Sequence, residues 1–501
     1  MINSKKDINI QDAISYYFDG KKLSKHEFIF SMISSLITLV LFYAIYSNWI
    51  LTNAHWDLGW LKHVTWQNIF QKMPNTCCST TENNSIYISW LWHFTPFFSI
   101  VSALSFLWPF SSFSWFAIFL AMAPALLVFF TCNIFFLQKI LFSKFKALNY
   151  IFPILLSLSF GSIRAIAFPH YELYFLVFVL SAIYFAAQNS KFLYILSITM
   201  AVFLKEDSAL YIIILVWFIF FKKISTWYLF KRTLLLLVTP FVYLVSLNFI
   251  QVDYPINPSF PNMTNLESQY LGKPLLSHIS TNFLVDRLIN IVQSNYILII
   301  FIIFLTSIGF LTKNNLTIRL MLSTIPYFFV SIVALSWTKG EMLNYELLPI
   351  WTSVMLAVLL SPLYKLQLNN QKKLLTKIIL MIFLFFGLIN GSVKNIVNVA
   401  RTPSPDANTV NLLDSLIIEA KENSFILDSN FFVYNQNLVS YNSWLKDLNE
   451  LTAGQCFIHL PNSNTKKILV KNFSNFGLIT NPFQDSSFQV TCLQNKTSSR
   501  N

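Results

Sequence analysis

Apolar residues fall into long runs separated by short polar segments over most of the chain. Most of these runs approach the roughly 20 residues that a helix needs to cross the hydrocarbon core of a bilayer. The pattern predicts an α-helical polytopic membrane protein with about eleven transmembrane helices. The predicted spans cover residues 28–48, 113–137, 148–168, 172–187, 192–204, 208–221, 234–250, 295–311, 320–336, 346–364 and 378–393.

The composition agrees with a lipid environment. Hydrophobic residues make up 55% of the 501 residues and charged residues only 11%, against roughly 25% charged in a soluble domain. Such a chain cannot cover itself with polar side chains in water. The first apolar run follows a charged tail and has no small-residue cleavage signature, so we interpret it as a retained helix and not as a signal peptide.

Basic residues predict the orientation. With the tail 1–27 in the cytosol, 19 of the 35 Lys and Arg residues fall in the tail and the predicted inner loops. This distribution satisfies the positive-inside rule. The net charge of +13 is thereby explained as an orientation signal, and no nucleic-acid partner is expected.

Acidic residues show a second asymmetry. Beyond Glu27, every Asp and Glu falls in an outer loop or in the C-terminal region. Orientation does not require this, because acids contribute little to it. Chance in an acid-poor chain is one explanation; we favour the other, that binding or chemistry takes place on the outer side.

The predicted organisation has three parts. The basic tail 1–27 precedes a transmembrane domain, 28–394, which includes a long first outer loop, 49–112. Within that loop, residues 94–108 are apolar and are predicted to form an interfacial or re-entrant helix. The region 395–501 loses the long apolar runs, and short strand-like segments predict a small extracytoplasmic α/β unit. Cys456 and Cys492 could form a disulfide there.

Two candidate residues lie in the first outer loop. Asp57 stands among aromatic residues just past the first span. Partial burial there would raise its proton affinity and suit it as a general base, although an Asp at this place could simply cap a helix. His93 precedes Pro96 at the start of the re-entrant helix. It could donate to an anionic substrate, because a helix N-terminus attracts anions, or it could be an ordinary cap-region residue.

More candidates lie at two tight outer turns. Charged groups this close to lipid are costly unless they face a polar cavity. The stretch before the second turn, 192–204, is too short to cross the bilayer core fully, so its charges lie below the membrane surface. We predict a substrate site here; a self-neutralised ion cluster is the alternative. The candidates are Arg164, His170 and Glu172 at the first turn and Lys205, Glu206 and Asp207 at the second.

Tyr345 adds a further candidate for substrate binding from a later outer loop, 337–346. Several His and acidic residues on the outer side leave a divalent cation open as a cofactor, but no zinc-ligand spacing such as HExxH is present, so no metal ligands are assigned. The chain also has no Walker loop, GxGxxG or GxSxG motif.

Taken in order, these segments resemble the GT-C glycosyltransferase superfamily and, within it, the uncharacterised bacterial family called domain of unknown function 2079. The matching pieces are WDLGW around Asp57, HFTP at 93–96, FPHYE at 168–172, LKED at 204–207, NYELLP at 344–349, FILDSNFFVYNQNLVSYN at 425–442 and CFIHLP at 456–461. The chain departs from many GT-C members in having no second acid beside Asp57.

The resemblance implies a glycosyltransferase of a bacterial cytoplasmic membrane, with its site between the outer loops and the bilayer. A polyprenyl-phosphate-linked sugar would be the donor, its phosphate held by Lys205 and Arg164 with His93 or His170 donating. An extracytoplasmic lipid, glycan or protein would be the acceptor, with Asp57 as base. Two alternatives remain: a transporter or flippase for a lipid-linked or anionic substrate, and a non-catalytic envelope scaffold.

Overall fold

The computed structural model describes most of the helical part of the chain and four strands near its C-terminal end. The described residues are 10–15, 18, 22–52, 56–70, 95–138, 147–205, 207–220, 224–249, 276–334, 342, 344–360, 370–389, 396–397, 426–427, 456–459, 476–482 and 489–495. Every structural statement below concerns these residues. Side chains are described for fewer of them, and those of residues 48–60 are outside the description.

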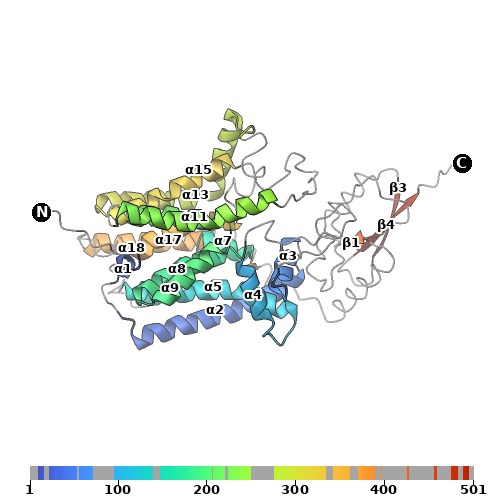
Figure 1. Ribbon diagram of the computed structural model, residues 1–501, viewed down its shortest axis with the longest axis horizontal. Coiled ribbons are helices and arrows are strands. Elements are labelled where there is room, and N and C mark those ends of the chain that lie inside the picture. Colours follow the sequence, from blue (N-terminus) through green and yellow to red (C-terminus); the bar gives the residue numbers. More distant parts are fainter. Residues whose placement is uncertain are drawn as a thin grey trace.

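Helices run roughly along the long axis of the molecule (Figure 1). The short helix α1 (Ile10–Ser15) lies at one end of this bundle and α3 (Trp56–Thr65) and α4 (Phe97–Ser105) lie at the other. We call these the α1 end and the α4 end. The helices between them are α2 (Lys25–Thr52), α5 (Ser112–Leu137), α6 (Leu148–Leu158), α7 (Gly161–Ala167), α8 (Leu173–Ala187), α9 (Lys191–Val202), α10 (Ser208–Phe220), α11 (Thr226–Phe249), α13 (Thr281–Leu311), α14 (Asn315–Leu322), α15 (Thr324–Val333), α17 (Leu348–Leu360) and α18 (Asn370–Ile389).

Four helical stretches are long and apolar enough to cross a membrane: Lys25–Ser47, Ser112–Leu137, Thr281–Leu311 and Asn315–Val333. The pair α6 and α7 adds a fifth if it counts as one span bent by 60°. The apolar helices α8, α9, α10, α17 and the apolar part of α18 have only 10–17 residues, and α11 is not among the helices that are apolar enough by this measure. Crossing by these shorter helices, and the total of eleven, remain predictions.

The outer faces of the long helices are apolar. On α2, Leu36 is 60% exposed and Val40 62% exposed, and on α13 Ile303 is 59% exposed. Contiguous exposed apolar surface of this kind is rare on soluble monomers. The helices and their surface are therefore those of a multi-pass membrane protein.

The break between α6 and α7 is built around Phe160. Its backbone has a φ of 46°, and its N–H donates to the carbonyl of Gly387 on α18. A Cβ on Gly387 would lie 2.4 Å from the Phe160 ring, so only glycine lets α18 approach this closely. On the other side, Gly161 lies against Trp351, whose indole N–H donates to Ser162 at 2.7 Å. The break is thus fixed by packing from two helices.

Helix α4 is the predicted re-entrant segment. Its nine residues span about 14 Å, too short to cross the bilayer core. Phe97 packs against Tyr174 on α8, and Phe98 packs edge-on against Tyr171 in the turn before α8. The Phe97 N–H also donates to the Phe203 carbonyl at 3.2 Å. These contacts hold α4 against the turns at this end of the bundle.

The four C-terminal strands form one sheet, in the order β1-β2-β4-β3. Their bounds are β1 Ile426–Leu427, β2 Cys456–His459, β3 Phe476–Pro482 and β4 Gln489–Asn495. The pair β1–β2 is parallel and the pairs β2–β4 and β3–β4 are antiparallel, with Cys456 opposite Cys492. The sheet lies beyond the α4 end (Figure 1).

Candidate functional site

A buried ionic cluster lies at the α4 end, where two tight turns meet. The first turn, 168–172, connects α7 to α8, and the second, 203–207, connects α9 to α10. Glu172 in the first turn and Lys205 in the second are both buried inside the protein.

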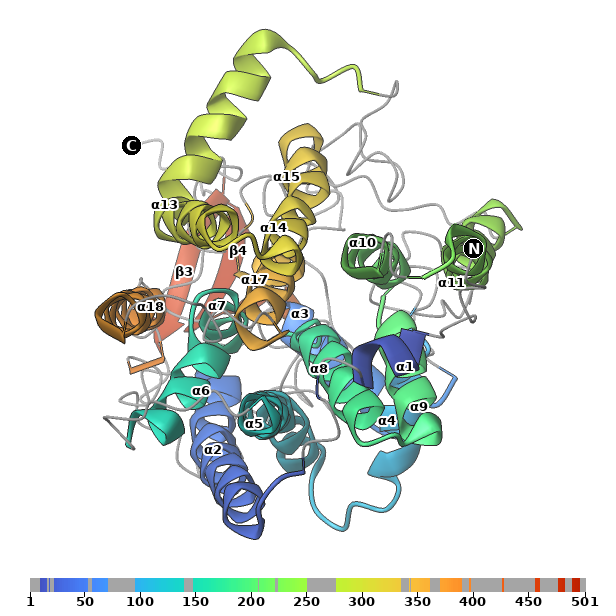
Figure 2. The ribbon, with the colours of Figure 1, turned by 90° about the vertical axis from the view of Figure 1, so that its left-hand side faces the viewer.

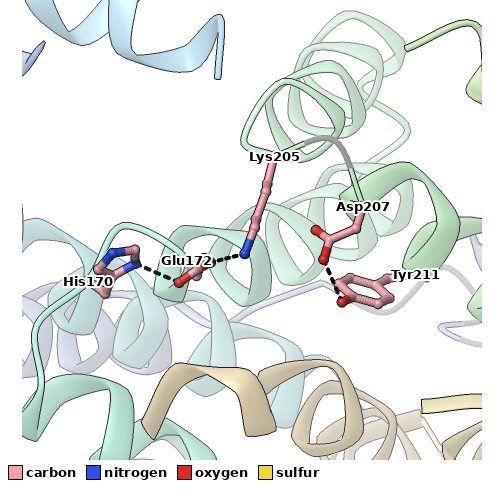
Figure 3. Close-up of polar contacts among 5 residues, drawn as sticks. All are labelled: His170, Glu172, Lys205, Asp207 and Tyr211. Atoms are coloured by element: carbon pink, nitrogen blue, oxygen red, sulfur yellow. Dashed lines mark hydrogen bonds and ion pairs between the residues drawn. The ribbon is translucent and has the colours of Figure 1, made fainter. Parts of the chain in front are cut away.

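Glu172 is the centre of this cluster. Its Oε1 atom accepts from the Lys205 ammonium at 2.6 Å, and its Oε2 atom lies 2.5 Å from the His170 Nδ1 atom. Figure 3 shows His170 and Lys205 reaching the carboxylate from opposite sides. Glu172 is 8% exposed and Lys205 is 5% exposed. The sequence placed these three residues among the candidates, and the fold brings them into direct contact.

The charge of Glu172 is set by these partners. Glu172 lies in the turn, one residue before the first residue of α8. Burial alone would raise the pKa of its carboxyl group, but the charges of Lys205 and His170 and their hydrogen bonds outweigh burial and hold the pKa well below its usual value. The carboxylate therefore stays ionised at neutral pH, as a buried charge does when it is paired.

A small cavity adjoins the cluster. It is lined by Glu172, Phe175, Lys205, Asp207, Ser208, Tyr211, Glu346, Leu348 and Pro349. Its free volume is about 20 Å³, enough for one water molecule. A sugar bound here would have to displace lining side chains.

Among the charged residues that line this cavity, acids outnumber bases, although Phe175, Leu348 and Pro349 give it an apolar wall as well. Three carboxylates, those of Glu172, Asp207 and Glu346, face a single ammonium group, that of Lys205. The Tyr211 hydroxyl donates to Asp207 at 2.7 Å, and the Tyr327 hydroxyl on α15 donates to the Tyr211 carbonyl (Figure 3 shows the first pair). Carboxylates accept hydrogen bonds. The cavity therefore suits hydroxyl groups or a cation better than a phosphate with no counterion.

Arg164 takes a separate position from the cluster. Its guanidinium group donates to the Asn295 side-chain oxygen and to the Ser294 carbonyl, both at 2.6 Å. Asn295 interrupts α13, with a φ of −130° and a ψ of 17°. Arg164 thus satisfies backbone and side-chain oxygens at the kink of α13.

Four predicted site residues are described only in part or not at all. Asp57 lies on α3 at the α4 end, but its side chain is outside the description. Tyr345 belongs to the single-turn helix η2 (Asn344–Leu347), again without a described side chain. His93 and Glu206 lie outside the described residues. No group of three or more potential metal ligands occurs among the residues that the structure describes.

Tyr211 and Ser208 line the cavity but were not among the predicted residues. A signal for Tyr211 was present, because a residue four positions after Asp207 lies on the same face of a helix. Ser208 had no such signal, since a single Ser at a helix start is common.

The fold and the cluster define a class: an α-helical membrane protein with a buried, partly neutralised ionic site at one end of its bundle. Comparison with known proteins does not assign the chain to a family. No family model matches the chain, and no curated protein matches it.

Proposed function

We propose that the protein is a membrane glycosyltransferase that moves a sugar from a polyprenyl-phosphate donor to an extracytoplasmic acceptor. The observation that supports this most is the carboxylate-lined cavity beside the Glu172 cluster, next to the end that carries α3 and α4. Sugar hydroxyls are hydrogen-bond donors, and carboxylates are their usual acceptors.

The proposed orientation puts the α4 end outside. The basic tail and α1 then face the cytosol of a bacterium, and eleven spans return the chain to the outer side. The C-terminal region, with its four-stranded sheet, forms a small extracytoplasmic α/β unit. Its position beyond the α4 end (Figure 1) is compatible with this arrangement.

In the proposed reaction, Asp57 accepts the proton of an acceptor hydroxyl group. The hydroxyl oxygen forms a bond to the anomeric carbon of the donor sugar while the bond from that carbon to the phosphate oxygen breaks. The lipid phosphate leaves with the bonding electrons, and the anomeric configuration inverts.

Lys205 and His170 have a joint role in this proposal. An ammonium group carries three donors, so Lys205 can bridge Glu172 and the departing phosphate. Glu172 keeps Lys205 and His170 in place through the contacts at 2.6 and 2.5 Å. Asp207 and Glu346 bind sugar hydroxyls or a divalent cation that accompanies the phosphate. Arg164 supports the scaffold through α13 and does not contact the donor.

The test is a transfer assay with the purified full chain in liposomes and a panel of synthetic polyprenyl-phosphate hexoses. We expect Asp57→Asn to reduce transfer by at least about 100-fold, the usual contribution of a general base. Asp286→Asn, a change on α13 away from the cavity lining, is the matched control. If Asp57→Asn transfers sugar as fast as the unaltered protein, Asp57 is not the base. If the unaltered protein transfers sugar from none of the donors, the proposed function is wrong.

A transporter or flippase is the second candidate. The bend of 60° between α6 and α7 and the interruption of α13 at Asn295 support it, because transporters bind substrates at broken helices. The described cavity lies at one end of the bundle, which favours the enzyme. Movement of a labelled polyprenyl phosphate across protein-containing liposomes, without sugar transfer, would favour the transporter. If the protein neither transfers a sugar nor moves the lipid but binds a cell-envelope polymer, it is a scaffold.

A further inference from the structure

An apolar groove lies between α9, α10 and α11. Its volume is about 480 Å³, within the roughly 300–1,000 Å³ typical of small-molecule sites. Its lining residues are Ile10, Gln11, Lys191, Tyr194, Ile195, Ile198, Thr199, Val202, Phe203, Ile212, Val216, Tyr228, Arg232, Leu235 and Leu236. The groove extends from the first residue of α9 to Phe203.

The groove has the length of a lipid chain. From Lys191 to Phe203 the helix rises about 18 Å, more than half the thickness of one bilayer core. A smaller apolar cavity of about 60 Å³ continues from it toward α8 and α17 and shares Tyr194, Ile198 and Ile212 with it. Figure 2, viewed from the α1 end, shows α1 lying beside α8 and α9, and Ile10 and Gln11 of α1 line the groove.

Cationic groups lie only at the α1 end of the groove. Lys191 begins α9, and Arg232 is the seventh residue of α11, where its guanidinium group stacks over the Tyr228 ring at 5.0 Å. Within the part of the chain that the structure describes, neither Lys191 nor Arg232 forms a salt bridge with a carboxylate. Two cations at the mouth of an apolar groove attract an anionic head group.

We propose that this groove binds an anionic phospholipid. The phosphate lies between Lys191 and Arg232, the Tyr194 and Tyr228 hydroxyls face the head group, and one acyl chain follows α9 toward Phe203. A soluble anion lacks the chain that fills the apolar wall, and a neutral lipid lacks the charge. The proposal does not depend on glycosyl transfer. It rests on the bundle being in a membrane with its α1 end at the cytosolic leaflet, where anionic lipids attract basic groups.

The experiment uses the full chain, purified in detergent, with phosphatidylglycerol as the probe and phosphatidylcholine as its neutral comparison. Binding is measured by native mass spectrometry at matched lipid concentrations. We expect Lys191→Gln and Arg232→Gln each to weaken phosphatidylglycerol binding about fivefold, and the double variant roughly 30-fold, from about 1 kcal/mol per cation. Phosphatidylcholine binding should not change.

Lys231→Gln is the matched control. Lys231 is adjacent to Arg232, is exposed and lies over the Trp227 ring at 5.3 Å, but it does not line the groove. Ile198→Trp fills the groove without changing charge and should abolish binding of both lipids. Circular dichroism and elution volume show whether each variant folds.

Three outcomes would overturn the proposal. Lys231→Gln could weaken binding as much as Arg232→Gln, which would mean attraction to the basic surface in general. The unaltered protein could bind both lipids equally. Glycerol phosphate, which has no acyl chain, could displace phosphatidylglycerol at equal concentration, which would mean a soluble anion site.

Discussion

Lys205 and Glu172 are 33 positions apart in the sequence, yet their side chains meet at 2.6 Å and both residues are almost fully buried. The pair joins the turn before α8 to the turn before α10. In an interior, removing one member of such a pair leaves a charge that water cannot solvate. The contact therefore links the local structure of two turns to the stability of the whole α4 end.

The first prediction concerns this pair. Lys205→Met should lower the free energy of unfolding by about 3–5 kcal/mol, because the Glu172 carboxylate loses its main counter-charge. The double variant Lys205→Met with Glu172→Gln should recover a large part of this loss, since no buried charge is then left unpaired. The measurement is thermal unfolding of the detergent-solubilised protein. Lys313→Met, at an exposed position after α13, should have little effect.

The second prediction is a pH dependence. In the folded protein the charges of Lys205 and His170 hold the pKa of Glu172 well below its ordinary value of 4.5. A lowered pKa means that the ionised carboxylate stabilises the fold fully above pH 4.5 and that this contribution is lost as the pH falls toward the lower pKa of the folded state. The difference in melting temperature between the protein and Glu172→Gln should therefore be constant near neutral pH and shrink below pH 4.5. A difference that grows on acidification would contradict the ion pair.

The third prediction separates scaffold from substrate binding at Arg164. Arg164→Met removes the donors to Asn295 and Ser294 at the kink of α13, and each unsatisfied buried acceptor costs about 1–3 kcal/mol. We expect a clear loss of thermal stability without any ligand. The melting temperature of Arg164→Lys should lie between those of the unaltered protein and Arg164→Met, because one ammonium group cannot reproduce the planar guanidinium fork. If Arg164→Met is as stable as the unaltered protein, Arg164 is again a candidate substrate ligand.

The fourth prediction tests the α6–α7 break. Gly387→Ala places a methyl group where the Phe160 ring now lies, 2.4 Å away, and overpacking of this kind costs about 1–3 kcal/mol. The same change combined with Phe160→Leu should be less harmful than the sum of the two single changes, because the smaller side chain makes room. Additive losses in thermal unfolding would show that the ring and the glycine do not compete for space.

The fifth prediction concerns the C-terminal sheet. Cys456 and Cys492 are register partners on antiparallel β2 and β4, where Cα atoms lie roughly 4.5–5.5 Å apart, a separation that a disulfide can bridge. In protein secreted to an oxidising compartment, neither should react with a maleimide until a reductant is added. Cys456→Ser should make Cys492 reactive without reductant. Reactive thiols in the unaltered protein would place this region in a reducing compartment or rule out the pair.

Apolar runs predicted helices within the spans, because a run of apolar residues in lipid has few alternatives to a helix. They did not predict α1, α3 or the part of α13 before residue 295. The break after Leu158 and the kink at Asn295 were not predicted. Both depend on contacts with distant helices: Gly387 and Trp351 at the first, and Arg164 at the second. Such partners are 131 or more residues away in the sequence, and a local pattern carries no information about them.

The site was predicted only in part, again because a local pattern does not show which distant residues come into contact. Charges at tight turns near lipid pointed to His170, Glu172 and Lys205, which the fold brings together. Sequence reasoning assigned Lys205 and Arg164 jointly to a phosphate, but their partners are a carboxylate and a helix kink. Which charge faces which is decided by the packing of α7 and α9 against other helices, and composition cannot show it.

The hydrogen bond from the Phe97 N–H to the Phe203 carbonyl joins α4 to the chain two residues before Lys205. Because the bond is between backbone atoms, no side-chain rotation can release it. A substrate that pushes α4 outward must therefore pull the Lys205 turn with it or break this bond. Helix α4 does not line the cavity, but through this bond a displacement of α4 is transmitted to the turn that carries Lys205 and so to the Glu172 ion pair.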